Sequence, residues 1–210
     1  NQLNASIRMV NKSTLHLRMH AGAGISYGNS QTSMPYDYSF FGGGSNDNRG
    51  WRARALGPGA YKYHLDTSRL ATQIGDIRFG GALEYRFDIS STFKGAIFTD
   101  FGNIWTYRED ASRLGSQFNW QTFIPQLAIS SGVGLRMDLD FFILRLDVGF
   151  PIFDPAFADG ARWVFQDFKT RETYYQEGMQ HFNMTLAQVK EIMPRPFLPN
   201  YLNFGIGYPF

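Results

Sequence analysis

The chain has 210 residues, a formal net charge of +2 and no cysteine. A charge this small, carried by scattered basic residues, does not favour a nucleic-acid partner. Without cysteine, neither a disulfide framework nor a thiolate metal site can form. The sequence has no apolar run near the roughly 18 residues that a membrane-spanning helix needs. A transmembrane β-barrel stays compatible with this composition, because its lumen-facing residues are polar.

Seven segments alternate between apolar and polar residues with the period of two that a β-strand imposes on its side chains. In chain order they are residues 3–9, 15–27, 77–89, 93–103, 129–137, 142–150 and 202–210. The third is the most regular, with one apolar and one ionic face. Its length exceeds the usual globular strand of about 5–6 residues and suits a tilted strand that crosses a bilayer, which needs about 9–11.

The connections between these segments alternate in length. Residues 11–14, 90–92 and 138–140 are short turns, whereas residues 28–72, 106–126 and 154–200 are long loops. Outer-membrane barrels have short periplasmic turns and long extracellular loops, which predicts a periplasmic C-terminus. In the last long loop, Thr185 and Gln188 form a capping-box pattern that predicts a short helix ending near Met193. The rest of the chain is predicted to be all-β.

The predicted fold is therefore a transmembrane antiparallel β-barrel. The alternative is a soluble β-sandwich, but its strands would be shorter and its turns would not sort by length at the two ends. Bacterial barrels close with an even number of strands, so seven predicts the C-terminal part of a larger barrel, or a sheet that closes with another piece. The start at Asn1 lacks a signal-peptide pattern and is interpreted as a cut or processed end.

Five motifs in order resemble the BamA/TamA superfamily of outer-membrane assembly proteins. Residues 40–45 (FFGGGS) and 48–51 (NRGW) resemble its sixth extracellular loop, and residues 98–105 (FTDFGNIW) its F-x-D-x-G-N-x-W strand. Residues 83–85 (LEY) resemble the strand between them, and residues 145–151 and 203–210 its last two strands. The ending NFGIGYPF is similar to TamA-like members from Bacteroidetes. The resemblance implies a sixteen-stranded barrel of which residues 1–210 form the last seven strands.

The first candidate site is a loop latch. Glu84 and Asp100 belong to the polar sets of strands adjacent in sequence, and an inward fold of the loop at residues 28–72 would bring Arg49 to them. The planar guanidinium can satisfy a carboxylate with two hydrogen bonds. The alternative is a solvated loop arginine beside generic lumen charges. The full predicted set follows the family motifs: Arg49, Gly50, Trp51, Glu84, Asp100 and Gly102.

The second candidate site is the terminal strand. Its members are Phe204, Gly205, Ile206, Gly207, Tyr208 and Phe210. The terminal aromatic residue resembles the sorting signal of outer-membrane strands, and an ordinary aromatic-girdle role is the alternative. Gly205 and Gly207 give this strand little inward packing. The resemblance implies that the strand closes the barrel against the first one along a seam that opens sideways.

These features predict a non-enzymatic factor that inserts or translocates outer-membrane proteins by strand templating. Its expected partners are outer-membrane lipids, unfolded client proteins and possible assembly subunits, with no nucleic acid. We expect no cofactor, metal or catalytic residue, since His16 and His20 would lie about 13 Å apart along a strand. Two alternatives stay open: a two-partner-secretion pore and the barrel anchor of a patatin-like lipase. The residues before Asn1, POTRA repeats or a lipase motif, would distinguish them.

Overall fold

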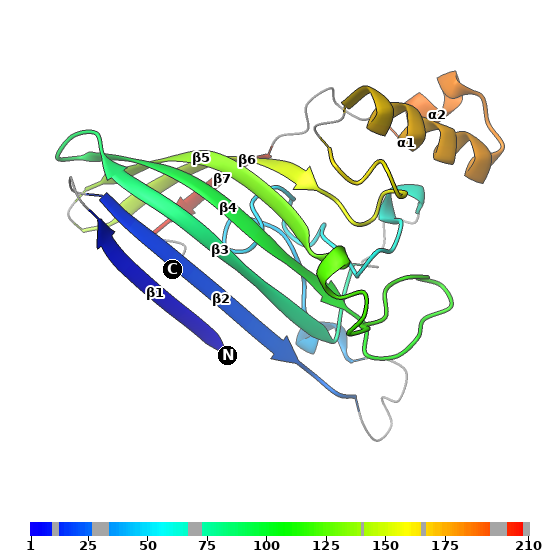
Figure 1. Cartoon of the computed structure of the whole chain (residues 1–210), viewed down its shortest axis with the longest axis horizontal. Helices are drawn as coiled ribbons and strands as arrows, with labels where there is room; N and C mark the ends of the chain where they lie inside the picture. The colour runs from blue at the N-terminus through cyan, green and yellow to red at the C-terminus, as the bar shows by residue number, and fades with distance from the viewer. Residues whose placement is uncertain are drawn as a thin grey trace.

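The computed structural model describes residues 1–9, 13–26, 34–66, 73–139, 141–164, 167–193 and 201–207. They form one seven-stranded antiparallel sheet in which each strand pairs with its neighbours in sequence (Figure 1). The strands are β1 (Gln2–Met9), β2 (Ser13–Ala23), β3 (Ile77–Asp88), β4 (Phe93–Trp105), β5 (Ala128–Asp138), β6 (Ile143–Phe153) and β7 (Tyr201–Ile206). The predicted seven-stranded, all-antiparallel order is confirmed.

The strand boundaries differ from the predicted ones by a few residues. β2 begins at Ser13, within the predicted turn at residues 11–14, and ends at Ala23. The alternating residues 24–26 therefore lie beyond the strand, and residue 27 lies outside the described residues. β4 and β6 each extend further toward the long loops than predicted, to Trp105 and Phe153. β7 is described as a strand up to Ile206, and the predicted remainder at residues 208–210 lies outside the described residues. Alternation identified the strands better than their ends, because loop residues can alternate too.

The polarity of the two sheet faces is inverted relative to that in a soluble protein. The apolar face is open to the surroundings, with Leu83, Ile97, Val133, Leu146 and Phe204 among its exposed side chains. The other face is polar and buried, and the loop between β2 and β3 packs against it. The buried charged residues include Arg49, Glu84, Asp100, Arg136, Arg145 and Asp147. An apolar exterior around a polar interior is the arrangement of a barrel wall in a membrane.

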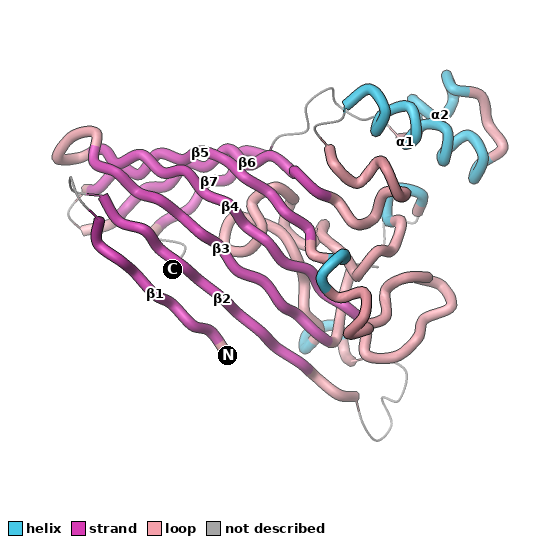
Figure 2. Tube along the Cα trace, in the orientation of Figure 1, coloured by secondary structure: helices cyan, strands magenta, loops and turns pink. Residues whose placement is uncertain are grey.

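The last long loop contains more helix than predicted. The capping box at Thr185 and Gln188 does begin a helix, α2 (Leu186–Ile192). The 16-residue helix α1 (Asp167–Phe182) precedes it and was missed (Figure 2). Its sequence lacks Leu, Ile and Val, so its apolar stripe consists of aromatic residues, Met and Gly and is easily overlooked. Among the described residues, no helix is both long enough and apolar enough to cross a membrane.

Candidate functional site

The loop between β2 and β3 carries Arg49 into the polar face of the sheet. The tip of this loop is a compact turn in which the amide of Gly44 donates to the carbonyls of Asn48 and Trp51, at 3.2 and 3.0 Å. The carboxylate of Asp47 accepts a hydrogen bond from the Gly43 amide at 2.7 Å. These bonds fix the backbone on both sides of Arg49, so its side chain points at the wall in one direction.

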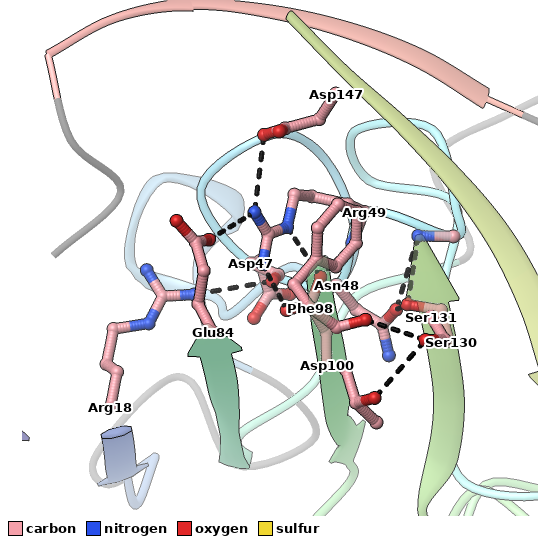
Figure 3. A network of polar contacts seen from close by, with 12 residues as sticks. Arg18, Asp47, Asn48, Arg49, Glu84, Phe98, Asp100, Ser130, Ser131 and Asp147 are labelled. Carbon is pink, nitrogen blue, oxygen red and sulfur yellow. Dashed lines mark hydrogen bonds and ion pairs between the residues drawn. The ribbon is translucent and has the colours of Figure 1, made fainter. Parts of the chain in front are cut away.

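The guanidinium of Arg49 lies between carboxylates from three strands (Figure 3). Its Nε and Nη2 donate to the two oxygens of Asp100 at 2.8 and 2.7 Å. Nη1 donates to Glu84 at 2.7 Å and to Asp147 at 3.3 Å. The Arg49 side chain is 1% exposed, and these carboxylates are 0% exposed. This planar donor fork, which makes four hydrogen bonds to carboxylates, suits arginine and no other side chain.

An aromatic ring completes the Arg49 pocket. The Arg49 Cζ lies 3.3 Å from the centroid of the Phe98 ring, in the stacked position of a cation–π contact. Phe98 pairs with Glu84 across β3 and β4, so the ring and the carboxylate come from adjacent positions of the wall. Sequence reasoning missed Phe98 because an apolar residue on a polar face is hard to recognise from alternation. It missed Asp147 as well, although Asp147 stands in the predicted polar set of its strand.

The carboxylates around Arg49 are shared with arginines from the wall. Glu84 accepts from Arg86 Nε at 2.6 Å and from Arg136 Nη2 at 3.0 Å. Asp147 pairs with Arg136 and with Arg145 Nε, the latter at 3.2 Å. Each charged side chain of this network therefore has at least one partner of opposite sign. Such a network is costly to break, since removal of one partner leaves an uncompensated charge in a poorly solvated place.

The backbone next to Arg49 lies directly on the sheet. The Gly50 amide donates to Ser130 Oγ at 3.2 Å, and the Asn203 side chain on β7 donates to the Arg49 carbonyl at 3.0 Å. A Cβ at Gly50 would lie 3.1 Å from the Pro151 nitrogen and would collide with Ser130. A Cβ at Gly149 would lie 2.6 Å from the Arg49 carbonyl carbon. Glycine at positions 50 and 149 is thus required by close approach of the loop to the wall.

The remaining predicted latch residues have different surroundings. Trp51 is buried against Leu56 and Ala128, and its Nε1 donates to Tyr63 Oη at 3.3 Å. Tyr63 in turn donates to Asp154 at 2.6 Å. Burial and the Asp154 carboxylate raise the pKa of Tyr63 well above its ordinary value, so it stays a neutral donor. Gly102 does not reach Arg49. It lies against the backbone of its β3 partner Gly80.

The terminal strand places its predicted residues on opposite sides of the sheet. Phe204 and Ile206 point outward and are 63% and 72% exposed. Gly205 pairs with Arg145, and the absence of a side chain there leaves room for the Arg145 guanidinium. Gly207 donates its amide to the Ile143 carbonyl at 2.7 Å. The predicted signal residues Tyr208 and Phe210 lie outside the described residues.

A protein-family model also matches most of this chain. The Omp85 superfamily domain matches residues 2–180. The chain belongs to the Omp85 superfamily. This confirms the superfamily that the ordered motifs predicted and assigns the chain to the bacterial outer membrane. The Bacteroidetes TamA-like subgroup stays a prediction.

A solved structure has a similar fold. BamA from Haemophilus ducreyi lacking POTRA domains 1–3 aligns with a TM-score of 0.53 and 17% sequence identity. The alignment covers 72% of this chain but 30% of BamA, so the chain corresponds to less than a third of that structure. No curated protein matches the sequence. Within the described part of this Omp85 chain, no group of His, Asp or Glu residues is arranged to hold a metal ion.

Proposed function

We propose that this Omp85 chain is the C-terminal wall of a barrel that inserts or translocates outer-membrane proteins without chemical catalysis. The proposal depends chiefly on β7. Among the described residues, this strand pairs only with β6 and lies at the edge of the sheet. An edge strand can act as a template for an incoming strand through main-chain hydrogen bonds.

The composition of β7 supports the same role. Its outward side chains Leu202, Phe204 and Ile206 are exposed and apolar, as a strand passing into lipid requires. Gly205 contributes no side chain toward the interior, which lowers the cost of separating β7 from its neighbours. A client strand that pairs with β7 would gain main-chain hydrogen bonds while keeping its own apolar face toward lipid.

In this proposal the Arg49 site acts as a latch for the loop. The Arg49 side chain binds β3, β4 and β6, and the Arg49 carbonyl binds Asn203 on β7. The latch would hold the wall rigid from β3 to β6 while β7 exchanges partners. The orientation with a periplasmic C-terminus, unfolded outer-membrane proteins as clients and further assembly subunits belong to the same proposal.

Site-specific crosslinking tests the templating role. The chain contains no cysteine, so Phe204→Cys places a unique thiol in this chain on the proposed working strand. An outer-membrane porin stalled during assembly, with a cysteine in its last strand, serves as the client. We expect a disulfide from position 204 and none from Val133→Cys, which is equally outward but lies in the middle of the sheet. Equal crosslinking from both positions, or none from position 204, would overturn the proposal.

A further inference from the structure

The long loop between β4 and β5 has a segment that folds back over the apolar outer face of the wall. We call residues 118–126 the aromatic flap. Its Phe123 ring lies 5.2 Å from the ring of Phe79, between centroids. Phe79 shares the face of Leu83, because side chains two or four residues apart in a strand point the same way. The aromatic flap therefore sits on the side opposite the Arg49 network.

The aromatic flap is held in place by specific contacts at the end of β4. Trp105 pairs with Ile77 on the same outward face, yet it is completely buried. Phe118 and Phe123 cover it, with ring centroids at 5.6 and 5.3 Å. Its Nε1 donates to the Gln126 side chain at 2.7 Å. These contacts give the aromatic flap a defined position at the end of β4.

The outer surface of the aromatic flap is uncharged, and it exposes apolar side chains beside the polar Asn119, Gln121 and Thr122. Trp120 is 82% exposed and Ile124 is 67% exposed. The sequence has no charged residue between Arg113 and Arg136, whereas the preceding part of the same loop contains Arg108, Glu109 and Asp110. Exposed tryptophan beside aliphatic residues is unfavourable in water, and tryptophan is enriched where an apolar medium meets a polar one.

We propose that the aromatic flap is a lipid anchor, which inserts Trp120 and Ile124 into the bilayer leaflet on the long-loop side. Lipid is the occupant because the flap continues the apolar outer face of β3 and β4, including the exposed Leu83 and Ile97, that already faces the membrane. The anchor fixes the depth of the β3–β5 wall at one membrane surface. It depends on the location in the outer membrane and is independent of which proteins are inserted.

Spin labelling tests the anchor in the protein reconstituted in lipid bilayers. A nitroxide is attached to Ile124→Cys, and its collision rates with oxygen and with a water-soluble nickel chelate are compared. Ile97→Cys in the middle of β4 is the lipid control, and Glu109→Cys on the charged part of the same loop is the aqueous control. We expect the oxygen preference at position 124 to approach that at position 97 and to exceed that at position 109 several-fold.

Two results would overturn the proposal. Nickel collision at position 124 equal to that at position 109 would place the aromatic flap in water. If neither oxygen nor the nickel chelate collided with the label at position 124, the aromatic flap would lie against a protein. A second measurement needs no spin label. Brominated phospholipids should quench the part of the tryptophan fluorescence that the Trp120→Phe variant lacks. The quenching should be strongest when the bromine lies near the headgroup end of the acyl chain. Absence of this quenching would also contradict the anchor.

Discussion

Arg49 and Asp100 share three hydrogen bonds, although 51 residues separate them in the chain. The Arg49 amide and Nε both donate to one carboxylate oxygen, at 2.9 and 2.8 Å, and Nη2 donates to the other at 2.7 Å. Asp100 thus binds the loop through its backbone and its side chain at once. These bonds therefore fix the position of the loop along the wall as well as attaching the loop to the wall.

Removing the guanidinium should destabilise the wall strongly. Arg49→Ala leaves the buried carboxylates of Asp100 and Glu84 without a main partner, and we expect a loss of about 3–5 kcal/mol in unfolding free energy. Arg49→Lys should restore little of it, since an ammonium cannot donate to both oxygens of Asp100 and stack on Phe98. Urea unfolding in detergent measures the change. Arg52→Ala, at an exposed position of the same loop, is the control and should stay within about 0.5 kcal/mol of wild type.

Replacing the Asp147 carboxylate should lower the unfolding free energy more than replacing the Asp138 carboxylate of the same sheet. Asp147→Asn removes the negative charge that Arg49, Arg136 and Arg145 share, whereas Asp138→Asn affects a half-exposed pair with Lys94. We expect a loss of several kcal/mol for Asp147→Asn and of at most about 1 kcal/mol for Asp138→Asn. The same unfolding measurement compares them. Equal losses would show that the buried network contributes no more than a surface ion pair.

Gly149→Ala should displace the loop without altering any charge. The added methyl group meets the Arg49 carbonyl, and the strand on one side and the anchored loop on the other leave it no space. We expect faster protease cleavage within residues 34–66 and a lower unfolding temperature. Val148→Ala, the outward neighbour, should leave the cleavage rate of the loop unchanged. If Gly149→Ala were cleaved at the wild-type rate, the loop could move away from the wall at little cost in free energy.

Helix α1 should detach from the loop between β2 and β3 at acidic pH. Glu177 of α1 accepts from Lys62 at 2.8 Å and from His64 at 3.1 Å. Burial alone would raise the pKa of Glu177, but these hydrogen bonds outweigh it and lower the pKa below its ordinary value. A depressed carboxylate pKa stabilises the contact above the ordinary value of about 4.3, and this stabilisation is lost as the pH falls through the lowered pKa.

Hydrogen exchange in α1 measures this pH dependence. In the wild type, we expect residues 171–182 to be protected from exchange at neutral pH and to lose this protection in acid. In Glu177→Gln, we expect weaker protection at neutral pH and no further loss in acid. Glu172→Gln is the control, because its partner Gln176 lies on the same helix and both are exposed. An acid step that persists in Glu177→Gln would assign the transition to another group.

The sequence by itself determined the strands and the polarity of their faces. Alternation is a local property, so residues 77–89 carry it whatever they pair with, and the capping box at Thr185 begins α2 for the same reason. Together with the ordered motifs, this local information identified the superfamily and grouped Arg49, Glu84 and Asp100 as one candidate set.

Only the tertiary structure decided which residues meet Arg49 and what covers the outer face. Asp147 lies 98 residues from Arg49, Phe98 has no polar signature, and Gly149 acts through the side chain it lacks. The aromatic flap likewise depends on a contact between Phe123 and Phe79 that no local pattern indicates. The physical reason is that side-chain alternation needs one strand, whereas charge pairing and close approach depend on strand register, sheet curvature and the path of the loops.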